Sequence, residues 1–135
     1  MLKQKRVYEI PTSEDGVKIL VERLWPRGLT KERAKIDIWL KDIAPSTELR
    51  KWYNHMPERW PEFQKRYQLE LEENYNIVRG LKKKVDTTDI TLIFAAKDAA
   101  RNSAVVLKNH LEKKTFCLKK KSCNFLSFIQ KRLDI

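Results

Sequence analysis

The sequence predicts an α/β fold, with a small mixed, mostly parallel sheet flanked by helices in a single domain. Two apolar runs carry this prediction, residues 17–24 and 90–96, because both are rich in the aliphatic side chains that pack on a pleated sheet. The chain between them is mostly helical in pattern. A helical crossover joins parallel strands, so the two runs should lie parallel. The length of 135 residues fits one ordinary domain.

The net charge of +11 is unevenly distributed along the chain. Residues 113–135 hold seven Lys or Arg and one Asp, whereas residues 1–112 hold 22 basic and 17 acidic residues. We therefore expect an α/β domain over residues 1–114 and a basic, amphipathic extension over residues 115–135. Because the excess charge lies in the extension, it gives little support to a nucleic-acid groove in the domain.

No part of the sequence indicates a membrane span, a metal site or a cofactor. No run approaches the ~18 apolar residues of a membrane span, and the N-terminus lacks the apolar segment of a secretory signal. We therefore expect a cytoplasmic protein without a transmembrane segment. Cys117 and Cys123 are not spaced as metal ligands and are expected to be reduced thiols, with a redox or metal role as the alternative.

The N-terminal segment predicts a first strand over residues 5–10, followed by turn residues 11–16. The pair Asp15-Gly16 favours a reversal of the chain. We therefore expect the first two strands to form an antiparallel hairpin.

The second strand should stop abruptly at a Trp-Pro-Arg-Gly sequence. Pro26 has no N–H to donate, and Gly28 permits backbone angles that other residues avoid. Thr30 is expected to cap a short helix through residue 35. Residues 36–40 fit either a strand or a helix.

Helices dominate the middle of the predicted domain. Ser46 is expected to cap a short helix. A longer helix is predicted over residues 61–78, ending at Gly80. The residues that predict it recur at steps of three and four: Trp60, Phe63, Tyr67, Leu71, Asn74 and Val78.

The second apolar run, residues 90–96, should be buried on both faces, as strands of parallel sheets are. Asp98 is expected to cap the helix that follows. That helix would bury Ala104, Leu107 and Leu111.

Polar side chains follow both runs, at the edge where open α/β sheets bind ligands. Arg23, Trp25 and Arg27 follow the first run, and Lys97, Asp98 and Asn102 follow the second. Guanidinium groups bind phosphate and carboxylate, so we expect Arg23 and Arg27 to bind a small anion, with Trp25 and Asn102 beside it. The alternatives are internal ion pairs for the arginines, core packing for Trp25 and a loop hydrogen bond for Asn102.

Asp98 and His55 are the candidate catalytic residues. Asp98 is a candidate general base or an orienting partner of Arg23, with helix capping as its alternative role. Imidazole groups can accept and donate protons near neutral pH, so His55 is a candidate general acid or base, with a structural or surface role as the alternative. No nucleophile can be assigned, so the sequence leaves open whether the protein is an enzyme.

Three motifs carry a resemblance to a known family: Arg-Leu-Trp-Pro-Arg-Gly at 23–28, Ala-Pro-Ser at 44–46 and Ala-Ala-Lys-Asp at 95–98. Over roughly residues 4–112 the chain resembles the YeaO-like family, small bacterial and archaeal proteins within domain of unknown function 488. The resemblance implies a small α/β domain with polar residues at strand ends. The chain departs from the family at Glu22, where Asp is usual, and around Asn102, where the family commonly has histidines.

The extension combines a basic run with an amphipathic stretch. Lys119, Lys120 and Lys121 are candidates for binding nucleic acid. The apolar residues after them suit docking on the domain, formation of a homo-oligomer, or an anionic membrane surface. The sequence thus favours a protein that binds a small anionic ligand, with a nucleic-acid-binding module and a structural or partner-binding protein as alternatives.

Overall fold

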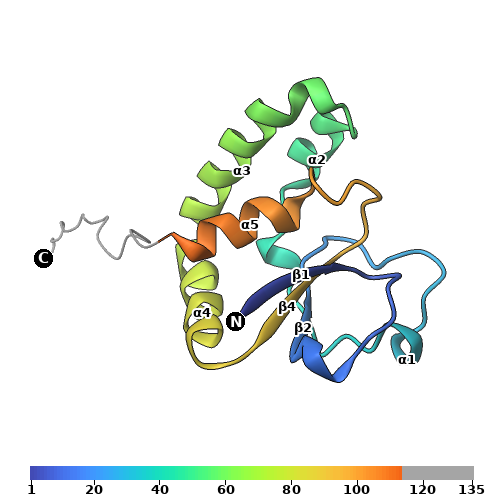
Figure 1. Cartoon of the computed structure of the whole chain (residues 1–135). Coiled ribbons are helices and arrows are strands. Elements are labelled where there is room, and N and C mark those ends of the chain that lie inside the picture. The colour runs from blue at the N-terminus through green and yellow to red at the C-terminus, as the bar shows by residue number, and fades with distance from the viewer. Residues whose placement is uncertain (114–135) are drawn as a thin grey trace, which may run out of the picture.

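Four parallel strands form the sheet. The computed structural model describes residues 1–113, in which the strands are β1 (Leu2–Arg6), β2 (Val17–Leu20), β3 (Ile38–Trp39) and β4 (Ile90–Phe94). They lie in the order β1-β4-β2-β3 (Figure 1). The central strand β4 pairs with both β1 and β2, which places Arg6 level with Phe94 and Leu20 level with Ile93. Three strands therefore end together, at what we call the carboxyl edge.

Helices cover both faces of the sheet unequally. They are α1 (Lys31–Ala34), α2 (Thr47–Tyr53), α3 (Trp60–Glu73), α4 (Tyr75–Thr87) and α5 (Ser103–Glu112), with short 3-10 helices η1 (Ser13–Asp15), η2 (Lys41–Ile43) and η3 (Pro57–Arg59). Figure 1 shows α2, α3, α4 and α5 gathered on one side of the sheet and α1 on the other. The α/β class predicted from the sequence is confirmed.

The core explains why β4 lies at the centre. All five of its residues are buried, and its four apolar side chains are divided between two apolar clusters. Leu92 and Phe94 join the larger cluster beneath α3 and α5, whereas Ile93 packs with Leu20 in a smaller cluster on the other face. The prediction of a strand buried on both faces and parallel to the second strand is confirmed.

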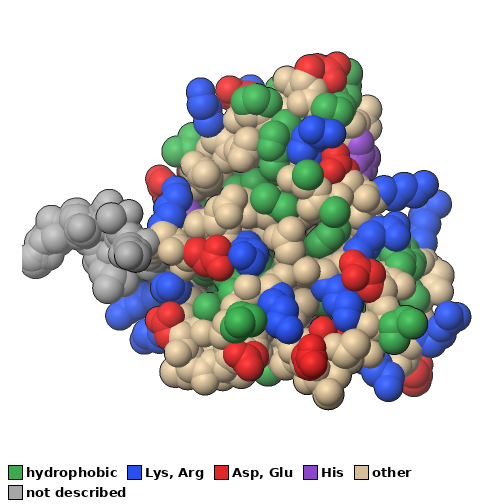
Figure 2. Space-filling view, viewed as in Figure 1, with side chains coloured by type: hydrophobic (Ala, Val, Ile, Leu, Met, Phe, Trp, Pro, Cys, Tyr) green, Lys and Arg blue, Asp and Glu red, His purple; other side chains and the backbone are tan. Residues whose placement is uncertain are grey.

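Charges of both signs are interspersed over the surface. Figure 2 shows Lys and Arg side chains among Asp and Glu side chains on this face of the molecule. Within residues 1–113, no helix is both long and apolar enough to cross a membrane. The same residues contain no group of three or more His, Cys, Asp or Glu side chains arranged to bind a metal.

The helix predicted over residues 61–78 is two helices. Helix α3 ends at Glu73, and Asn74 lies between the two helices. Helix α4 then runs through Gly80 to Thr87. The prediction that Gly80 ends a helix was therefore wrong. The interruption was hidden because the apolar spacing runs across it, from Leu71 to Val78, both of which are buried.

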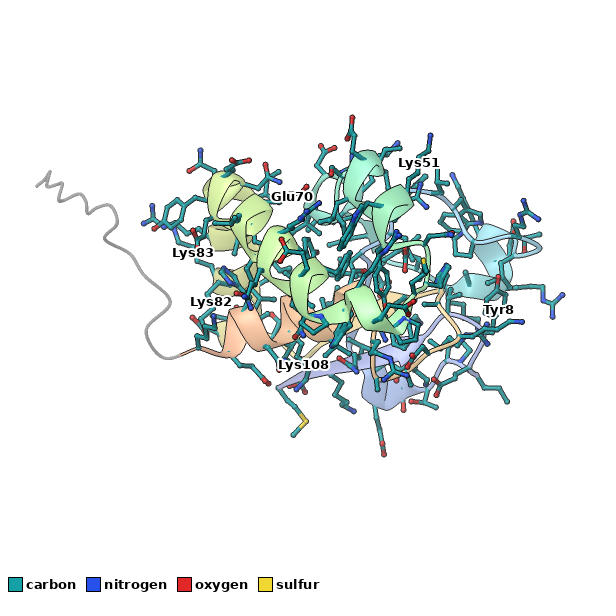
Figure 3. All side chains as sticks on the ribbon, turned by 90° about the horizontal axis from the view of Figure 1, so that it is seen from above. Tyr8, Lys51, Glu70, Lys82, Lys83 and Lys108 are labelled. Carbon is teal, nitrogen blue, oxygen red and sulfur yellow. The ribbon has the colours of Figure 1, made fainter. Side chains whose placement is uncertain are left out.

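Helix α4 leads into the amino end of β4, so its basic run lies far from the carboxyl edge. Figure 3 shows Lys82 and Lys83 at one end of the molecule and Tyr8, which follows β1, at the other. The Lys82 ammonium forms an exposed ion pair with Asp86 on the same helix. This run therefore belongs to the solvated surface of the helix.

The predicted antiparallel hairpin was wrong, as was the first strand over residues 5–10. Strand β1 ends at Arg6, and β1 and β2 pair with β4 rather than with each other. Gly16 has φ of 65°, and the next amide, Val17 N–H, donates to the Asp89 carbonyl. The Asp-Gly turn therefore feeds the chain across β4 into a parallel strand instead of reversing it.

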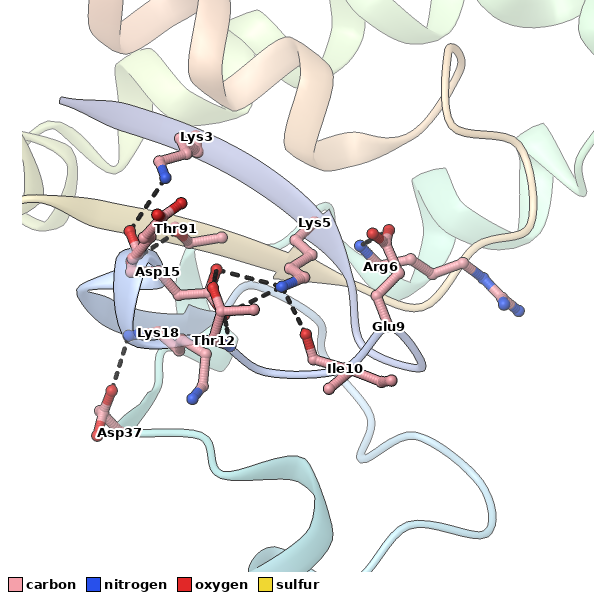
Figure 4. A network of polar contacts seen from close by, with 11 residues as sticks. Lys3, Lys5, Arg6, Glu9, Ile10, Thr12, Asp15, Lys18, Asp37 and Thr91 are labelled. Carbon is pink, nitrogen blue, oxygen red and sulfur yellow. Dashed lines mark hydrogen bonds and ion pairs between the residues drawn. The ribbon is translucent and has the colours of Figure 1, made fainter.

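A partly buried polar network holds this crossing in place (Figure 4). Asp15 accepts hydrogen bonds from the Thr12 amide and the Lys5 ammonium, and its backbone carbonyl accepts one from the Thr91 hydroxyl. Lys5 also donates to the Ile10 carbonyl. Because Asp15 is only 5% exposed, the network satisfies a charge that would otherwise be costly to bury.

Candidate functional site

A cleft of about 960 Å³ opens at the carboxyl edge of the sheet. It is enclosed by the ends of β1, β2 and β4, by α2 and the turn after it, and by the loop that precedes α5. Its lining residues are Arg6, Tyr8, Glu22, Pro45, Arg50, Tyr53, His55, Phe63, Ala95, Ala96, Lys97, Asp98, Arg101, Asn102 and Ser103. The parallel arrangement thus produces a hollow where three strands end.

Aromatic and small apolar groups form part of the cleft wall. The Tyr53 and Phe63 rings lie 4.7 Å apart, centroid to centroid, and both residues are buried. Burial raises the pKa of the Tyr53 hydroxyl, so this group is neutral at physiological pH. Part of the cleft is therefore suited to the uncharged portion of a ligand.

Four basic side chains line the same cleft: Arg6, Arg50, Lys97 and Arg101. Arg6 donates from Nε to the Ala96 carbonyl at 3.1 Å, and its guanidinium carbon lies 4.5 Å from the centroid of the Tyr8 ring. Figure 4 shows the Arg6 side chain extending away from the Asp15 network. These contacts fix the position of the guanidinium while leaving its terminal nitrogens without a protein acceptor among residues 1–113.

Arg50 is the least satisfied of these groups. Its Nε is buried without a hydrogen-bond partner. The guanidinium forms no hydrogen bond or ion pair with the described residues, and the nearby Glu22 carboxylate attracts its charge. A buried donor left unpaired costs about 1–3 kcal/mol. Arg50 therefore gains more from an incoming anion than a side chain already paired within the protein.

Glu22 places one carboxylate among these cations. Its Oε2 accepts a hydrogen bond of 3.0 Å from the Ala95 amide, which joins the ends of β2 and β4. Burial raises the pKa of Glu22, while the Ala95 N–H and the charges of Arg50 and His55 favour its ionised form. Its Oε1 has no hydrogen-bond partner within the described part of the chain.

The loop before α5 is held by Asp98, but Asp98 does not cap the helix as predicted. Asn102 is the N-cap: its Oδ1 accepts from the Val105 amide at 3.1 Å, and its Nδ2 donates to the Asp98 carbonyl at 2.9 Å. Asp98 instead closes the preceding turn by accepting from Ala100 N–H and from both the amide and Nε of Arg101. These hydrogen bonds lower the pKa of Asp98, and the bond from the Ala100 N–H has the largest effect.

His55 lies on the turn after α2, where the backbone is unusual. Asn54 and His55 have φ of 47° and 55°, in the left-handed region that few residues other than glycine adopt. The exposed His55 imidazole lies 6.4 Å from the Tyr53 ring. The cleft thus brings together three of the residues proposed from the sequence: His55, Asp98 and Asn102.

Arg23, Trp25 and Arg27 lie outside the cleft. Arg23 donates to the Ala44 and Pro45 carbonyls at 2.9 and 3.0 Å, which holds the segment before α2. Trp25 donates to the Leu29 carbonyl and packs in the smaller core cluster, on the other face of the sheet. Arg27 is exposed, and its backbone carbonyl accepts from the Tyr8 hydroxyl.

Sequence reasoning missed Arg6, Glu22, Arg50 and Arg101 as residues of one cleft. The expected hairpin sent the end of β1 to the opposite edge of the sheet and so removed Arg6 from consideration. Had β1 been taken as a third parallel strand, its last residue would have fallen beside Glu22 and Lys97. No sequence pattern predicts that Arg50 lines the cleft, because its position depends on how α2 packs over the sheet.

Comparison with known proteins identifies relatives without an assigned activity. Residues 1–124 match the family model described as the inactive DUF488-N3 subclade, so the match includes part of the predicted extension. The uncharacterised protein Rv3073c of Mycobacterium tuberculosis is 44% identical over 102 residues, which cover 76% of this chain and 86% of that protein. The uncharacterised protein YeaO of Escherichia coli is 38% identical over 107 residues, covering 79% and 93% respectively. No solved structure matches the chain.

Proposed function

The chain belongs to the DUF488 family, in the subclade described as inactive, and we propose that it binds a small anionic ligand, a phosphate or a carboxylate, in the cleft at the carboxyl edge. The observation that carries the proposal is the Arg50 guanidinium, which lines the cleft without a hydrogen-bond or ion-pair partner among residues 1–113. Phosphate and carboxylate oxygens match the donors of a guanidinium in geometry and charge.

The charge of the cleft supports the same proposal. Four basic and two acidic side chains line it, which leaves two positive charges in excess. Asp98 and Arg101 form an ion pair of 2.9 Å, so Arg101 is oriented toward a fixed partner, whereas the Lys97 ammonium is exposed and forms no ion pair among the described residues. Arg50 and Lys97 are therefore the groups with the most to gain from an anion.

Asp98, one of the two candidate catalytic residues, is better suited to a binding site than to proton transfer. Its carboxylate already accepts three hydrogen bonds, which lower its pKa and make it a weak base. We assign Asp98 the role of orienting Arg101, and Asn102 that of fixing the loop at the start of α5. The word inactive in the family description agrees with a binding role.

The test is thermal unfolding of the full chain with phosphate, sulfate or malate, compared with chloride at equal ionic strength. A bound anion stabilises the folded state as its concentration rises above Kd, by about 2.7 kcal/mol at 100-fold excess. We expect stabilisation of the wild type, its loss in Arg50→Gln, and its retention in Arg79→Gln, which removes an exposed arginine of α4.

Lys97→Gln provides a second variant at an exposed position, where a change cannot disturb the core. It should weaken the stabilisation by anions without lowering the melting temperature measured in chloride. The proposal fails if no anion stabilises the wild type beyond chloride, or if Arg50→Gln and Lys97→Gln respond as the wild type does.

Nucleic-acid binding through Lys119, Lys120 and Lys121 is the second candidate function, favoured by the concentration of positive charge in the extension. These residues, and the predicted docking or self-association of the extension, lie outside the described residues. A cytoplasmic location and a homo-oligomeric state also remain predictions from the sequence.

A further inference from the structure

The cleft is larger than an inorganic anion requires. Pockets that enclose most of a small organic ligand measure about 300–1,000 Å³, and this one measures about 960 Å³. Buried aromatic groups, Tyr53 and Phe63, form part of its wall beside the basic side chains. A ligand that fills the cleft therefore has an organic body attached to its anionic group.

Glu22 restricts the chemistry of that body. A carboxylate next to an anion-binding group repels a bare anion, so its presence is unfavourable unless the ligand also brings a hydrogen-bond donor. Oε2 is occupied by the Ala95 amide, while Oε1 has no partner among residues 1–113. A ligand donor at Oε1 would complete the hydrogen bonding of this partly buried carboxylate.

The donor that suits this position is a neutral hydroxyl rather than an ammonium. The charges of Arg50 and His55 already act on Glu22 and favour its ionised form. The lining as a whole has two more basic than acidic side chains, which disfavours a ligand cation. Hydroxyl groups of sugars donate to carboxylates in the same way in nucleotide-binding sites.

We infer that the cleft binds a hydroxylated phosphate monoester, with the phosphate held by Arg50 and Lys97 and a hydroxyl group donating to Glu22. This inference rests on the proposed function. A phosphate monoester carries about −1.5 to −2 charges at neutral pH, which matches the two positive charges in excess around the cleft. A sugar phosphate and a nucleoside monophosphate share this chemistry, and they differ in whether a planar base accompanies the sugar.

Calorimetric titration of the full chain with four probes tests each part of the ligand. Ribose 5-phosphate has both the phosphate and the hydroxyl groups, propyl phosphate has only the phosphate, ribose has only the hydroxyl groups, and adenosine 5′-monophosphate adds a base. We expect ribose 5-phosphate to bind at least tenfold more tightly than propyl phosphate, and ribose alone not to bind. Tighter binding of adenosine 5′-monophosphate would identify the nucleoside source, and weaker binding the sugar phosphate.

Glu22→Gln keeps an acceptor for Ala95 N–H but removes the charge that strengthens the hydroxyl bond. It should reduce the preference for ribose 5-phosphate over propyl phosphate by about tenfold, because hydrogen bonds to charged groups are roughly twice as strong as neutral ones. The control Glu62→Gln, on the exposed surface of α3, should leave the preference unchanged.

Two results would separate this inference from the proposed function. If ribose 5-phosphate and propyl phosphate bind equally and Arg50→Gln abolishes both, the anion site stands and the role of Glu22 in selecting a hydroxyl is wrong. An unchanged preference in Glu22→Gln leads to the same conclusion. If no phosphate compound binds the wild type, this inference fails, and the proposed function then depends on whether malate stabilises the wild type beyond chloride.

Discussion

At the scale of single residues, the surroundings of Glu22 both disfavour and favour its ionised form. Burial raises its pKa, although the Ala95 amide and the charges of Arg50 and His55 act in the other direction. A carboxyl group with a raised pKa stabilises the folded state most at pH values below its ordinary pKa. That contribution is lost as the pH rises through the higher pKa of the folded state.

Replacing Glu22 by Gln should therefore stabilise the protein at pH 7. We expect a gain of about 0.5–1 kcal/mol, typical of a substitution that trades a functional group for stability. The gain should shrink as the pH falls through the raised pKa of Glu22, and it should be gone below the ordinary pKa of a glutamic acid, where the side chain is protonated in both the folded and the unfolded state. Chemical denaturation of both proteins between pH 3.5 and pH 8 measures the difference.

The Glu62→Gln control should change stability by only about 0.2–0.5 kcal/mol, because its ion pair with Arg66 is exposed. A Glu22→Gln protein that is less stable than the wild type at pH 7 would contradict the prediction. It would show that the attraction of Arg50 and the Ala95 bond outweigh the cost of burial.

His55 offers a second test at this scale, through its backbone. With φ of 55° it occupies the left-handed region, which is strained for β-branched side chains. His55→Val should lower the free energy of unfolding by about 1–2 kcal/mol. His55→Asn should leave it within about 0.5 kcal/mol of the wild type, because Asn tolerates this conformation. Equal effects of the two substitutions in denaturant titrations would exclude backbone strain at His55.

At the scale of secondary structure, the patterns that were recognised correctly are local. Ser46 caps α2 and Thr30 caps α1, each accepting a backbone N–H three residues later, as their side chains predict. The two strongest strands were found because aliphatic runs bounded by turn residues need no knowledge of their partners. The break at Asn74 was missed because the direction of a helix depends on what packs against it, and apolar spacing does not record this.

A substitution at Gly80 tests whether this residue ends a helix, as predicted from the sequence, or lies inside α4, as in the structure. In the structure it lies inside α4, its φ is not positive, and nothing lies within 4 Å of where a Cβ would be. Gly80→Ala should therefore raise the free energy of unfolding by about 0.5–1 kcal/mol, measured by thermal or denaturant unfolding.

Gly16→Ala is the contrasting variant. Gly16 has φ of 65°, and an added Cβ would lie 2.3 Å from the Asp89 carbonyl oxygen. This substitution should destabilise by on the order of 2 kcal/mol or more. Destabilisation by Gly80→Ala would instead place Gly80 in a left-handed conformation at a helix end, contrary to the structure.

At the scale of the whole molecule, strand order determines the site. The carboxyl edge was predicted from two parallel strands, and the cleft found there includes Asp98, Asn102 and His55. Placing β1 on the far side of β4 adds Arg6 to the same edge. No local signal fixes that order, because it follows from the parallel crossing at Gly16 and from the pairing of chain segments almost ninety residues apart, as between Leu2 and Ile90.

The division of charge between domain and extension separates the two candidate functions in one experiment. Changing Lys119, Lys120 and Lys121 together to Gln should weaken binding to duplex DNA and reduce its slope of log affinity against log salt, by up to about 0.9 for each phosphate group that is no longer neutralised. Anion stabilisation of the domain should persist, because Arg50 and Lys97 are unchanged.

The matched control changes three exposed domain lysines, Lys31, Lys35 and Lys65, to Gln. Absence of DNA binding by the wild type at low salt, or equally weakened binding in both triple variants, would rule out a nucleic-acid function specific to the extension.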